Sequence, residues 1–441
     1  MGMKGYGKAS AGVLTATTLI MGLMGSVSAH PRLIAGHKPV TVTLMTWQSA
    51  STNQLILNAM KPLEKKYPWI HVVNVPTPSS DYYQKLDTMF TAHNLPDLFW
   101  SGNEHEQQWG AQKLLYNWTK FANKPGVPWF NLKKFAPDSV INWRVKGQLY
   151  GLPTFMNTYG YYYNANLFKA AHLPLPKPGW TYQQFFHDAQ VLTQKSGTKV
   201  TRYAVMFPWN TAWNLGQYAF SAGGLPFTNR ISNPTKVTAA KQYIKGTQLW
   251  VKAIKAGWAT PPAYTVSNGT AVFSSGKVPM MGGGQWLTVA ILQNKPNFQW
   301  GWAPEPIVKR RVEPYDAVGI ASPTYIKDPQ AVWLVMSYLD TIGLGKMLYQ
   351  HPVASPAYVP GASYYFNALN KDGKVSVANS VKFELTAPNK IPVKFLAPWA
   401  GNANNVVTAD WNNILMGKVP VYKGVSHMVF QINQSIKTSV P

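Results

Sequence analysis

The chain combines a length of 441 residues with a strong basic bias and a complete lack of cysteine. The length and the 46% hydrophobic content suit a globular protein with two lobes or one large domain. Without cysteine there are no disulfides, thiol nucleophiles or thiolate metal sites. The 41 Lys and Arg are scattered, with no Arg-rich helix, RNP-like motif or zinc pattern, so nucleic-acid binding is not expected.

The net charge of +25 arises from a shortage of acidic residues, of which there are 16. A protein with few carboxylates has few groups to protonate at low pH and loses little stability there. The composition therefore suggests the hypothesis of an acidophile's protein that works in an acidic exterior.

The N-terminal segment has the pattern of an export signal. Lys4 and Lys8 precede an apolar run from about residue 11 to 27, and Val27-Ser28-Ala29 resembles a cleavage site. Residues 1–29 are therefore predicted to be a signal peptide, and an extracellular, cell-surface or periplasmic location follows. Because the run approaches the ~18 residues that span a bilayer, an uncleaved anchor is the alternative.

The first part of the chain alternates between strand and helix patterns, which favours a parallel sheet. We expect strands at 41–47, 69–75 and 96–101, a helix capped by Ser51 or Thr52 and kinked or restarted at Pro62, and a second helix from Tyr82.

The stretch 147–168 consists of two β-type runs joined by a polar segment at 154–158. Gly151 is expected to relax the backbone there, and Pro153 fixes one φ angle. The composition is that of a loop or of a hinge between two lobes, with a second crossover expected at 317–321.

The second part repeats the alternation. A capping box of Thr181 and Gln184 opens a helix, Gly257 is placed to end another, and Asp328 caps a third. Further strands are expected at 202–207, 278–281 and 299–302.

The order of these motifs resembles the extracellular solute-binding proteins of ABC importers, in particular the sugar-binding group that includes maltose-binding proteins. The segments that carry the resemblance are VTLMTW at 42–47, PLEKKYPWIHV at 62–72, LPDLFWSGN at 95–103, GQLYGLPTFMNTYGYYYNANLF at 147–168, WTYQQFFHDAQVLT at 180–193, FSSGKVPMMGGGQW at 273–286 and KDPQAVWLVMSYL at 327–339.

The resemblance implies an α/β, two-lobed, type II periplasmic-binding-protein-like fold, with hinged lobes that each have a central sheet flanked by helices. The N-terminal lobe would comprise 38–154 and 319–373, and the C-terminal lobe 155–318 and 374–441. A monomer would bind a sugar in the cleft and pass it to the membrane permease subunits of an ABC transporter, without a cofactor.

Aromatic side chains beside amides and hydroxyls suit a sugar, whose rings have apolar C–H faces and a polar rim. The candidate ligand-binding residues are Gln48, Ser49, Trp100, Asn103, Glu104, Phe155, Asn157, Trp209, Asn210, Trp213, Gln285, Trp286, Tyr315, Trp399 and Asn402.

The resemblance places Trp100 and Trp286 at aromatic site positions of the family. Asn103 and Asn157 stand where maltose binders often carry an acid, which puts maltose itself in doubt. For Glu104, an exposed helix surface is the alternative to a role in the site.

Two other classes of function remain open. A secreted carbohydrate-active enzyme would need a pair of facing carboxyls, and no catalytic or metal-binding motif is recognisable. A binder of an anionic solute, such as a uronic oligosaccharide or a glycerol phosphate compound, would suit the positive charge, although Arg is scarce near the candidate loops.

Overall fold

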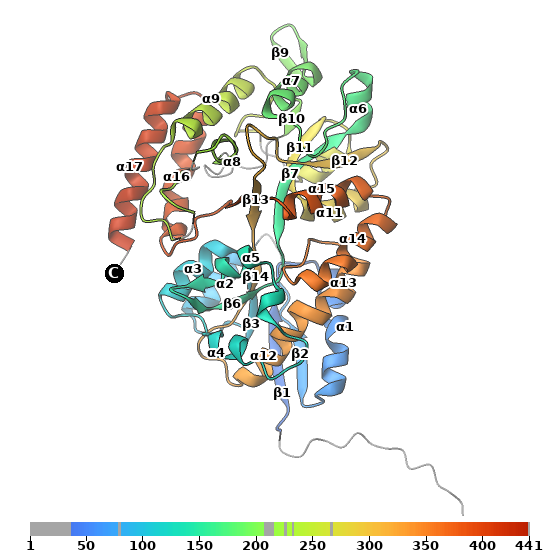
Figure 1. Ribbon diagram of the computed structural model, residues 1–441, viewed down its shortest axis with the longest axis vertical. Helices are drawn as coiled ribbons and strands as arrows, with labels where there is room; N and C mark the ends of the chain where they lie inside the picture. The colour runs from blue at the N-terminus through green and yellow to red at the C-terminus, as the bar shows by residue number, and fades with distance from the viewer. Residues whose placement is uncertain are drawn as a thin grey trace, which may run out of the picture. The chain divides into compact units, whose positions relative to one another are not determined.

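The computed structural model describes residues 37–77, 81–206, 216–224, 227–231, 233–264 and 268–439. Residues 39–441 form one compact unit, built as two lobes around two β-sheets (Figure 1). The predicted export signal lies outside the described residues.

The sheet of the first lobe has five strands in the order β2-β1-β3-β14-β6. β1 pairs in parallel with β2 and β3, as the alternating pattern predicted, and β14 pairs antiparallel with β3 and β6. The strands are β1 (Val40–Met45), β2 (Ile70–Asn74), β3 (Leu98–Ser101), β6 (Gly151–Pro153) and β14 (Gly319–Ala321).

The sheet of the second lobe is centred on β7, which pairs antiparallel with β11, β12 and β13. Its strands are β7 (Asn157–Asn164), β10 (Val205–Met206), β11 (Met280–Gly284), β12 (Trp300–Pro304), β13 (Glu313–Asp316) and β15 (Lys390–Pro392). All eight residues of β7 are buried, since successive side chains enter opposite cores. Tyr161 and Tyr163 join one hydrophobic cluster and Tyr162 joins the other.

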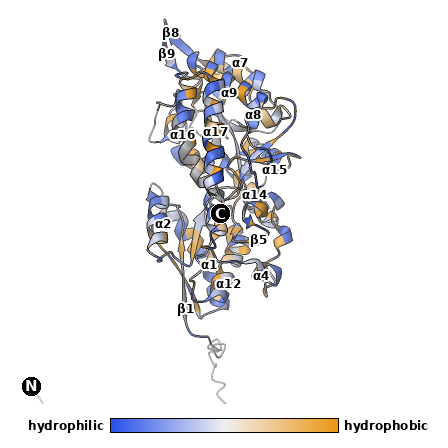
Figure 2. Cartoon of the chain, turned by 90° about the vertical axis from the view of Figure 1, so that its left-hand side faces the viewer, coloured by the Kyte–Doolittle hydropathy of each residue, from blue (hydrophilic) through white to orange (hydrophobic). Residues whose placement is uncertain are grey.

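Helices cover both sheets. In the first lobe they are α1 (Ala50–Lys66), α2 (Tyr82–Thr91), α3 (Asn103–Ala111), α4 (Thr119–Asn123), α5 (Pro137–Asn142), α12 (Pro329–Tyr338), α13 (Leu344–Gln350) and α14 (Ala362–Lys371). In the second they are α6 (Ala165–Ala170), α7 (Tyr182–Leu192), α8 (Gly216–Ser221), α9 (Lys241–Lys255), α10 (Gly269–Ser274), α11 (Thr288–Asn294), α15 (Val375–Leu385), α16 (Ala400–Leu415) and α17 (Val421–Ser439). Their exposed faces are mostly hydrophilic (Figure 2).

Shorter elements complete the fold. They are the hairpins β4 (Arg144–Val145) with β5 (Gln148–Leu149) and β8 (Gln194–Ser196) with β9 (Lys199–Arg202), the 3-10 turns η2 (Leu132–Lys134), η4 (Gln285–Leu287) and η6 (Val359–Gly361), and the π-helical turn η5 (Leu339–Gly343).

Among the described residues, one helical stretch, Pro329–Gln350, is long and apolar enough to cross a membrane. The cap predicted at Asp328 marks the start of this stretch. Its most apolar window is 89% buried, and α12 packs against β1 and α1, so this stretch belongs to the hydrophobic core of the first lobe.

Several local predictions are confirmed. Thr181 and Gln184 form the predicted capping box, the Asp328 carboxylate accepts from the Ala331 N–H at 2.9 Å, and Gly257 follows α9 with φ +73°. One was wrong: Ser49 caps α1 in place of Ser51 or Thr52. Of the two alternatives expected at Pro62, the restart does not occur, because α1 runs through this residue.

The chain passes between the lobes twice in the region that the sequence indicated. β6 belongs to the first sheet and β7 to the second, so residues 154–156 between them form one crossover. β13 belongs to the second sheet and β14 to the first, so residues 317–318 form another. The two crossovers are bonded together, because the N–H groups of Thr154 and Phe155 both donate to the Val318 carbonyl, at 2.9 and 3.0 Å.

Gly151 was expected to give the backbone conformational freedom, but its role in the structure is in packing. A Cβ at this position would overlap the Trp143 ring and the Ile320 carbonyl. Trp143 is fully buried, and its Nε1–H donates to the carbonyl of Ala317 at 2.9 Å. The indole of Trp143 therefore holds the crossover at 317–318 against β6, the strand that leads into the crossover at 154–156.

We expect Gly151→Ala to destabilise the protein by about 2 to 3 kcal/mol, because the new methyl group must displace buried atoms. Gly361→Ala is the matched control, since the nearest atom to its added Cβ would be 3.5 Å away. Denaturant unfolding measures both. Equal stability of the two variants would contradict the packing role of Gly151.

Candidate functional site

A network of polar side chains lies where the second lobe meets the crossovers. The register of β7 and β13 places Asn157 opposite Asp316. The Asp316 carboxylate accepts from the Asn157 amide at 2.6 Å and from the Tyr159 hydroxyl at 2.5 Å, and all three side chains are largely buried. Asn157 therefore has an acid as its direct partner, supplied by β13, the strand that leads into the other crossover.

Gln285 holds the first crossover in place. Its Oε1 accepts from the Thr158 N–H at 2.6 Å, and its Nε2–H donates to the Met156 carbonyl at 3.0 Å. The side chain is fully buried. Gln285 thus acts on the backbone of the crossover, and the prediction that it binds the ligand directly does not fit this arrangement.

Trp286 follows Gln285 and is half-buried. Its ring meets that of Tyr159 edge to face, with centroids 5.2 Å apart. A Cβ on Gly284 would overlap the Trp286 ring, so the glycine lets the indole fold back over the end of β11. Trp286 is positioned from both sides and keeps part of its surface exposed.

A second aromatic group borders the same crossover from the first lobe. Trp100 is only 1% exposed, because Trp47 and Phe155 cover it with ring centroids at 5.1 and 5.5 Å. Phe155 is itself buried. The predicted platform of Trp100 is therefore covered, and the half-buried Trp47, which also contacts Tyr83, holds the more exposed position.

A cavity of about 440 Å³ opens beside this group, at the start of α1. Trp47, Gln48 and Ser49 contribute to its lining. The Ser49 hydroxyl accepts from the Thr52 N–H at 3.2 Å as the cap of α1, whereas Gln48 lines the cavity with its side chain half-buried. Gln48 therefore stays a predicted ligand contact.

Two predicted ligand residues lie in the core. Trp399 is 2% exposed, donates from Nε1 to the Pro234 carbonyl at 3.0 Å and packs on Phe395. Tyr315 is 2% exposed, and burial raises the pKa of its hydroxyl. Its neighbour Asp316 is the residue of β13 that enters the network, since side chains alternate along a strand.

The side chains of the other six predicted residues lie outside the described part of the structure. Trp209, Asn210 and Trp213 lie outside the described residues. Asn103 and Glu104 begin α3 and Asn402 lies in α16, with only their backbone described; α3 and α16 pack against each other across the lobes.

Trp47, Tyr83, Tyr159 and Asp316 were not among the predicted ligand-binding residues. Trp47 ends the strand expected at 41–47 and lies two residues beyond β1, at the carboxyl end of the strand, which is a usable signal. Tyr159 had none, because it sits within an aromatic run of a buried strand. Trp100 contacts Phe155, and Trp286 contacts Tyr159. These two contacted residues are only four positions apart in the chain.

The described residues contain no group of three or more His, Asp or Glu side chains that could hold a metal ion. A second carboxyl close to the crossovers, Asp340, accepts from the Thr154 hydroxyl at 2.8 Å. Burial raises the pKa of Asp340 well above its ordinary value. This group is fully buried and anchors the crossover.

We expect Asp316→Ala to lower the free energy of unfolding by about 2 to 4 kcal/mol, since the buried Asn157 amide and Tyr159 hydroxyl both lose this acceptor. Asp316→Asn keeps one acceptor oxygen and should cost less. Chemical denaturation of the two variants checks the order. A smaller loss for alanine than for asparagine would contradict the network.

Comparison with known proteins agrees with this architecture. A family profile described as bacterial extracellular solute-binding protein matches residues 47–341. The multiple sugar-binding protein of Streptococcus mutans is 23% identical over 272 residues, which cover 58% of this chain and 59% of that protein. The chain thus matches somewhat over half the length of this curated relative.

Solved structures share the fold over nearly the whole chain. An ABC substrate-binding protein from Listeria monocytogenes in complex with cycloalternan has a TM-score of 0.77 at 18% identity, covering 91% of this chain and 100% of that one. The sugar-binding protein MalE of Xanthomonas citri has a TM-score of 0.71 at 18% identity, with 90% and 98% covered. UgpB of Mycobacterium tuberculosis in complex with glycerophosphocholine has a TM-score of 0.74 at 15% identity, with 91% and 99% covered.

The architecture is the type II fold of periplasmic binding proteins, with two lobes joined at crossovers. The profile match spans more than half of the sequence and includes the first crossover, Trp286 and α12. The chain belongs to the bacterial extracellular solute-binding protein family.

Proposed function

We propose that this protein binds an oligosaccharide between its lobes and delivers it to the permease of an ABC transporter. The observation that carries the proposal is the pair of partly exposed tryptophans, Trp47 and Trp286, on the two lobes. Trp47 packs on Trp100, which packs on Phe155 of the first crossover, and Trp286 packs on Tyr159 just beyond that crossover. Two indoles on either side of a hinge suit the apolar faces of successive sugar rings. The similar proteins whose names include sugars support this ligand class.

The proposed ligand contacts divide into platforms and hydrogen-bonding groups. Trp286 and Trp47 are the platforms, and Gln48 is a polar contact from the cavity beside α1. Asn103, Glu104, Asn402, Trp209, Asn210 and Trp213 remain proposed contacts. The network of Asn157, Tyr159 and Asp316 sets the floor of the site and positions Trp286 through the ring of Tyr159.

Binding is proposed to close the lobes around the ligand. The moving bodies would be 38–154 with 319–373 and 155–318 with 374–441, linked by the bonded crossovers. A ligand that contacts both lobes favours the closed form by its difference in affinity for the two forms. Solute binding of this kind makes and breaks no covalent bond, so we propose no enzymatic activity.

The proposed setting follows from family membership, which implies an exported, periplasmic or cell-surface protein. We propose that residues 1–29 direct this export, and that the protein is a monomer without cofactor or nucleic-acid partner. The acidic exterior suggested by the composition remains part of the proposal.

An anionic solute is the second candidate. Two observations favour it: the net charge of +25 and the fold shared with a protein solved in complex with glycerophosphocholine. However, among the described residues no Lys or Arg belongs to the aromatic contacts around Trp47 and Trp286 or to the network of Asn157, Tyr159 and Asp316. The carboxylate of Asp316 would also repel an anion.

Calorimetry against a panel of ligands tests the proposal. Neutral maltooligosaccharides and xylooligosaccharides are compared with uronates and glycerol phosphate compounds, each at low and high salt. A neutral oligosaccharide with salt-insensitive binding and no turnover is the expected result. Binding of anionic solutes alone would establish the second candidate, and glycan cleavage in the same tubes would overturn the assignment as a binding protein.

A further inference from the structure

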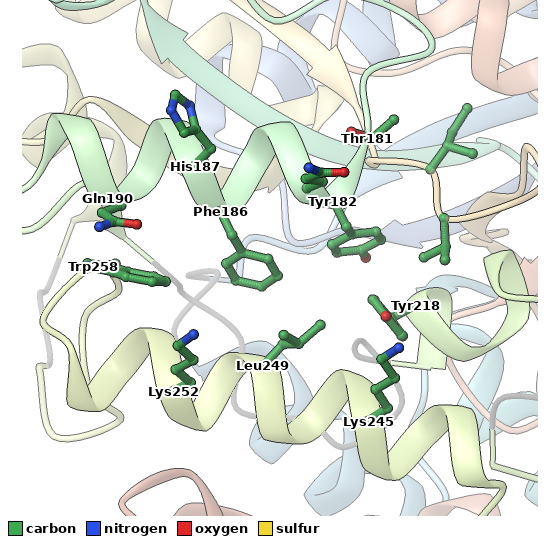
Figure 3. Close-up of a pocket in the computed structure, with 13 residues that line it drawn as sticks. Thr181, Tyr182, Phe186, His187, Gln190, Tyr218, Lys245, Leu249, Lys252 and Trp258 are labelled. Carbon is green, nitrogen blue, oxygen red and sulfur yellow. The ribbon is translucent and has the colours of Figure 1, made fainter.

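A groove in the second lobe lies between helices α7 and α9, separate from the crossovers (Figure 3). Its volume is about 540 Å³, within the range of pockets that hold small ligands. α7 supplies Phe186, His187 and Gln190 to its lining, and α9 supplies Lys245, Leu249 and Lys252.

The walls of the groove are held firmly. Phe186 packs on Trp250 of α9 with ring centroids 5.5 Å apart, and Phe185 contacts the same indole at 5.6 Å. At one end Tyr182 meets Tyr218 edge to face at 5.0 Å. The groove is therefore built on a rigid aromatic base, which keeps its two helices at a fixed spacing.

Aromatic surface remains partly exposed inside the groove. Phe186 and Leu249 point into it from opposite helices, and Trp258 closes one end (Figure 3). Gln183 and Gln190 on α7 are exposed beside them, and Thr181 lies at the start of that helix. Flat apolar surfaces bordered by amides and a hydroxyl fit sugar rings better than they fit an alkyl chain, which needs an enclosed apolar channel.

The charge of the groove is positive. Lys245 and Lys252 are exposed, seven residues apart on α9, and so about 10 Å apart along the helix. Neither has an acidic partner among the described residues, and the lining contains no Asp or Glu. Lys252 lies over the Trp258 ring at 5.8 Å, which places a cation beside an aromatic plate.

The acidic groups next to the groove are shielded from it. Asp188 is buried on the inner face of α7 and pairs with His187 at 3.2 Å. Glu305 lies beneath Tyr182, whose hydroxyl is 3.4 Å from the Glu305 carboxyl, and burial raises the pKa of Glu305 to about 8. Below that pH this carboxyl is mostly neutral and does not repel an anion.

We propose that the groove between α7 and α9 is a second carbohydrate site, and that its ligand is an acidic oligosaccharide bearing carboxylates. The sugar rings lie against Phe186 and Trp258, and the carboxylates meet Lys245 and Lys252. The site differs from the proposed interlobe site in both place and charge.

Titration with trigalacturonic acid tests this site, with the methyl ester of the same trimer as the neutral counterpart. We expect wild-type protein to bind the acid at least tenfold more tightly than the ester, and several-fold more weakly when salt rises from about 50 to about 200 mM. The double variant Lys245→Gln, Lys252→Gln should weaken binding at least tenfold.

Lys255→Gln is the matched control, because Lys255 lies on the same helix with its stem against Gly417, outside the groove. It should change affinity less than twofold, and Trp286→Ala should leave binding of the acid unchanged. Loss of binding in Trp286→Ala would place the trimer between the lobes and overturn the groove site. Equal binding of acid and ester, unchanged binding in the double variant, or no binding at millimolar concentrations would overturn it as well.

Discussion

Trp286→Ala is expected to weaken binding of the oligosaccharide ligand more than tenfold. The indole is half-buried against Tyr159 and has one part of its surface free, so its removal takes away a stacking plate of the proposed site. An aromatic plate contributes about 1.5 kcal/mol or more to such a contact, which corresponds to a factor of ten. Calorimetry with the sugar identified by the ligand panel measures the loss.

The variant should remain folded. Trp286 is outside the fully buried core, so the melting temperature without ligand should fall by only a few degrees. Trp258→Ala is the matched control, since Trp258 is also half-buried but lies at the groove between α7 and α9. If both variants bind the neutral sugar like wild type, Trp286 has no place in the site.

The second large effect concerns pH. Glu305, Glu313 and Glu384 are buried in the second lobe, and burial raises the pKa of each carboxyl, that of Glu305 to about 8. Glu384 lies close enough to Glu305 and Glu313 for their charges to raise its pKa further. Several of the 16 acidic residues are thus buried in the interior, where burial favours their neutral form.

The sign of the effect follows from proton binding. Below about pH 4.5 Glu305 is protonated in the folded and the unfolded protein alike. Between about 4.5 and 8 the folded protein keeps a proton that the unfolded chain releases, so stability falls as the pH rises through this window. For Glu305 alone the loss between pH 4 and pH 8 is on the order of 4 kcal/mol.

We therefore expect the melting temperature to rise as the pH falls from 8 to about 4.5, and Glu305→Gln to flatten this dependence. Glutamine keeps the shape of the side chain without a titrating proton. Calorimetric melting at several pH values measures both proteins. A wild-type melting temperature that falls steeply with acidification would contradict both this account and the hypothesis of an acidic exterior.

Local patterns in the sequence predicted the elements that position the site. The capping box at Thr181, the cap at Asp328 and both crossovers are confirmed because each depends on residues close in the chain. The parallel pairing of β1 with β2 and β3 also followed from the alternation of strands and helices.

The roles of individual aromatic residues could not be predicted in the same way. Trp100, Trp399 and Trp286 all have amide residues close by in the sequence. The burial of Trp100 and Trp399, however, depends on residues distant in the chain, such as Phe155 and Pro234. The pairing of Asn157 with Asp316 joins residues 159 positions apart and depends on the register of β7 and β13. The resemblance to maltose binders pointed to the neutral amide of Asn157, but not to the acid that accepts its hydrogen bond.

A crystal structure of the protein with the oligosaccharide selected by calorimetry tests the central claim most directly. The claim predicts the sugar between the two lobes, with rings against Trp286 and Trp47 and the first crossover beneath it. A sugar bound away from both indoles and from the crossovers would contradict it.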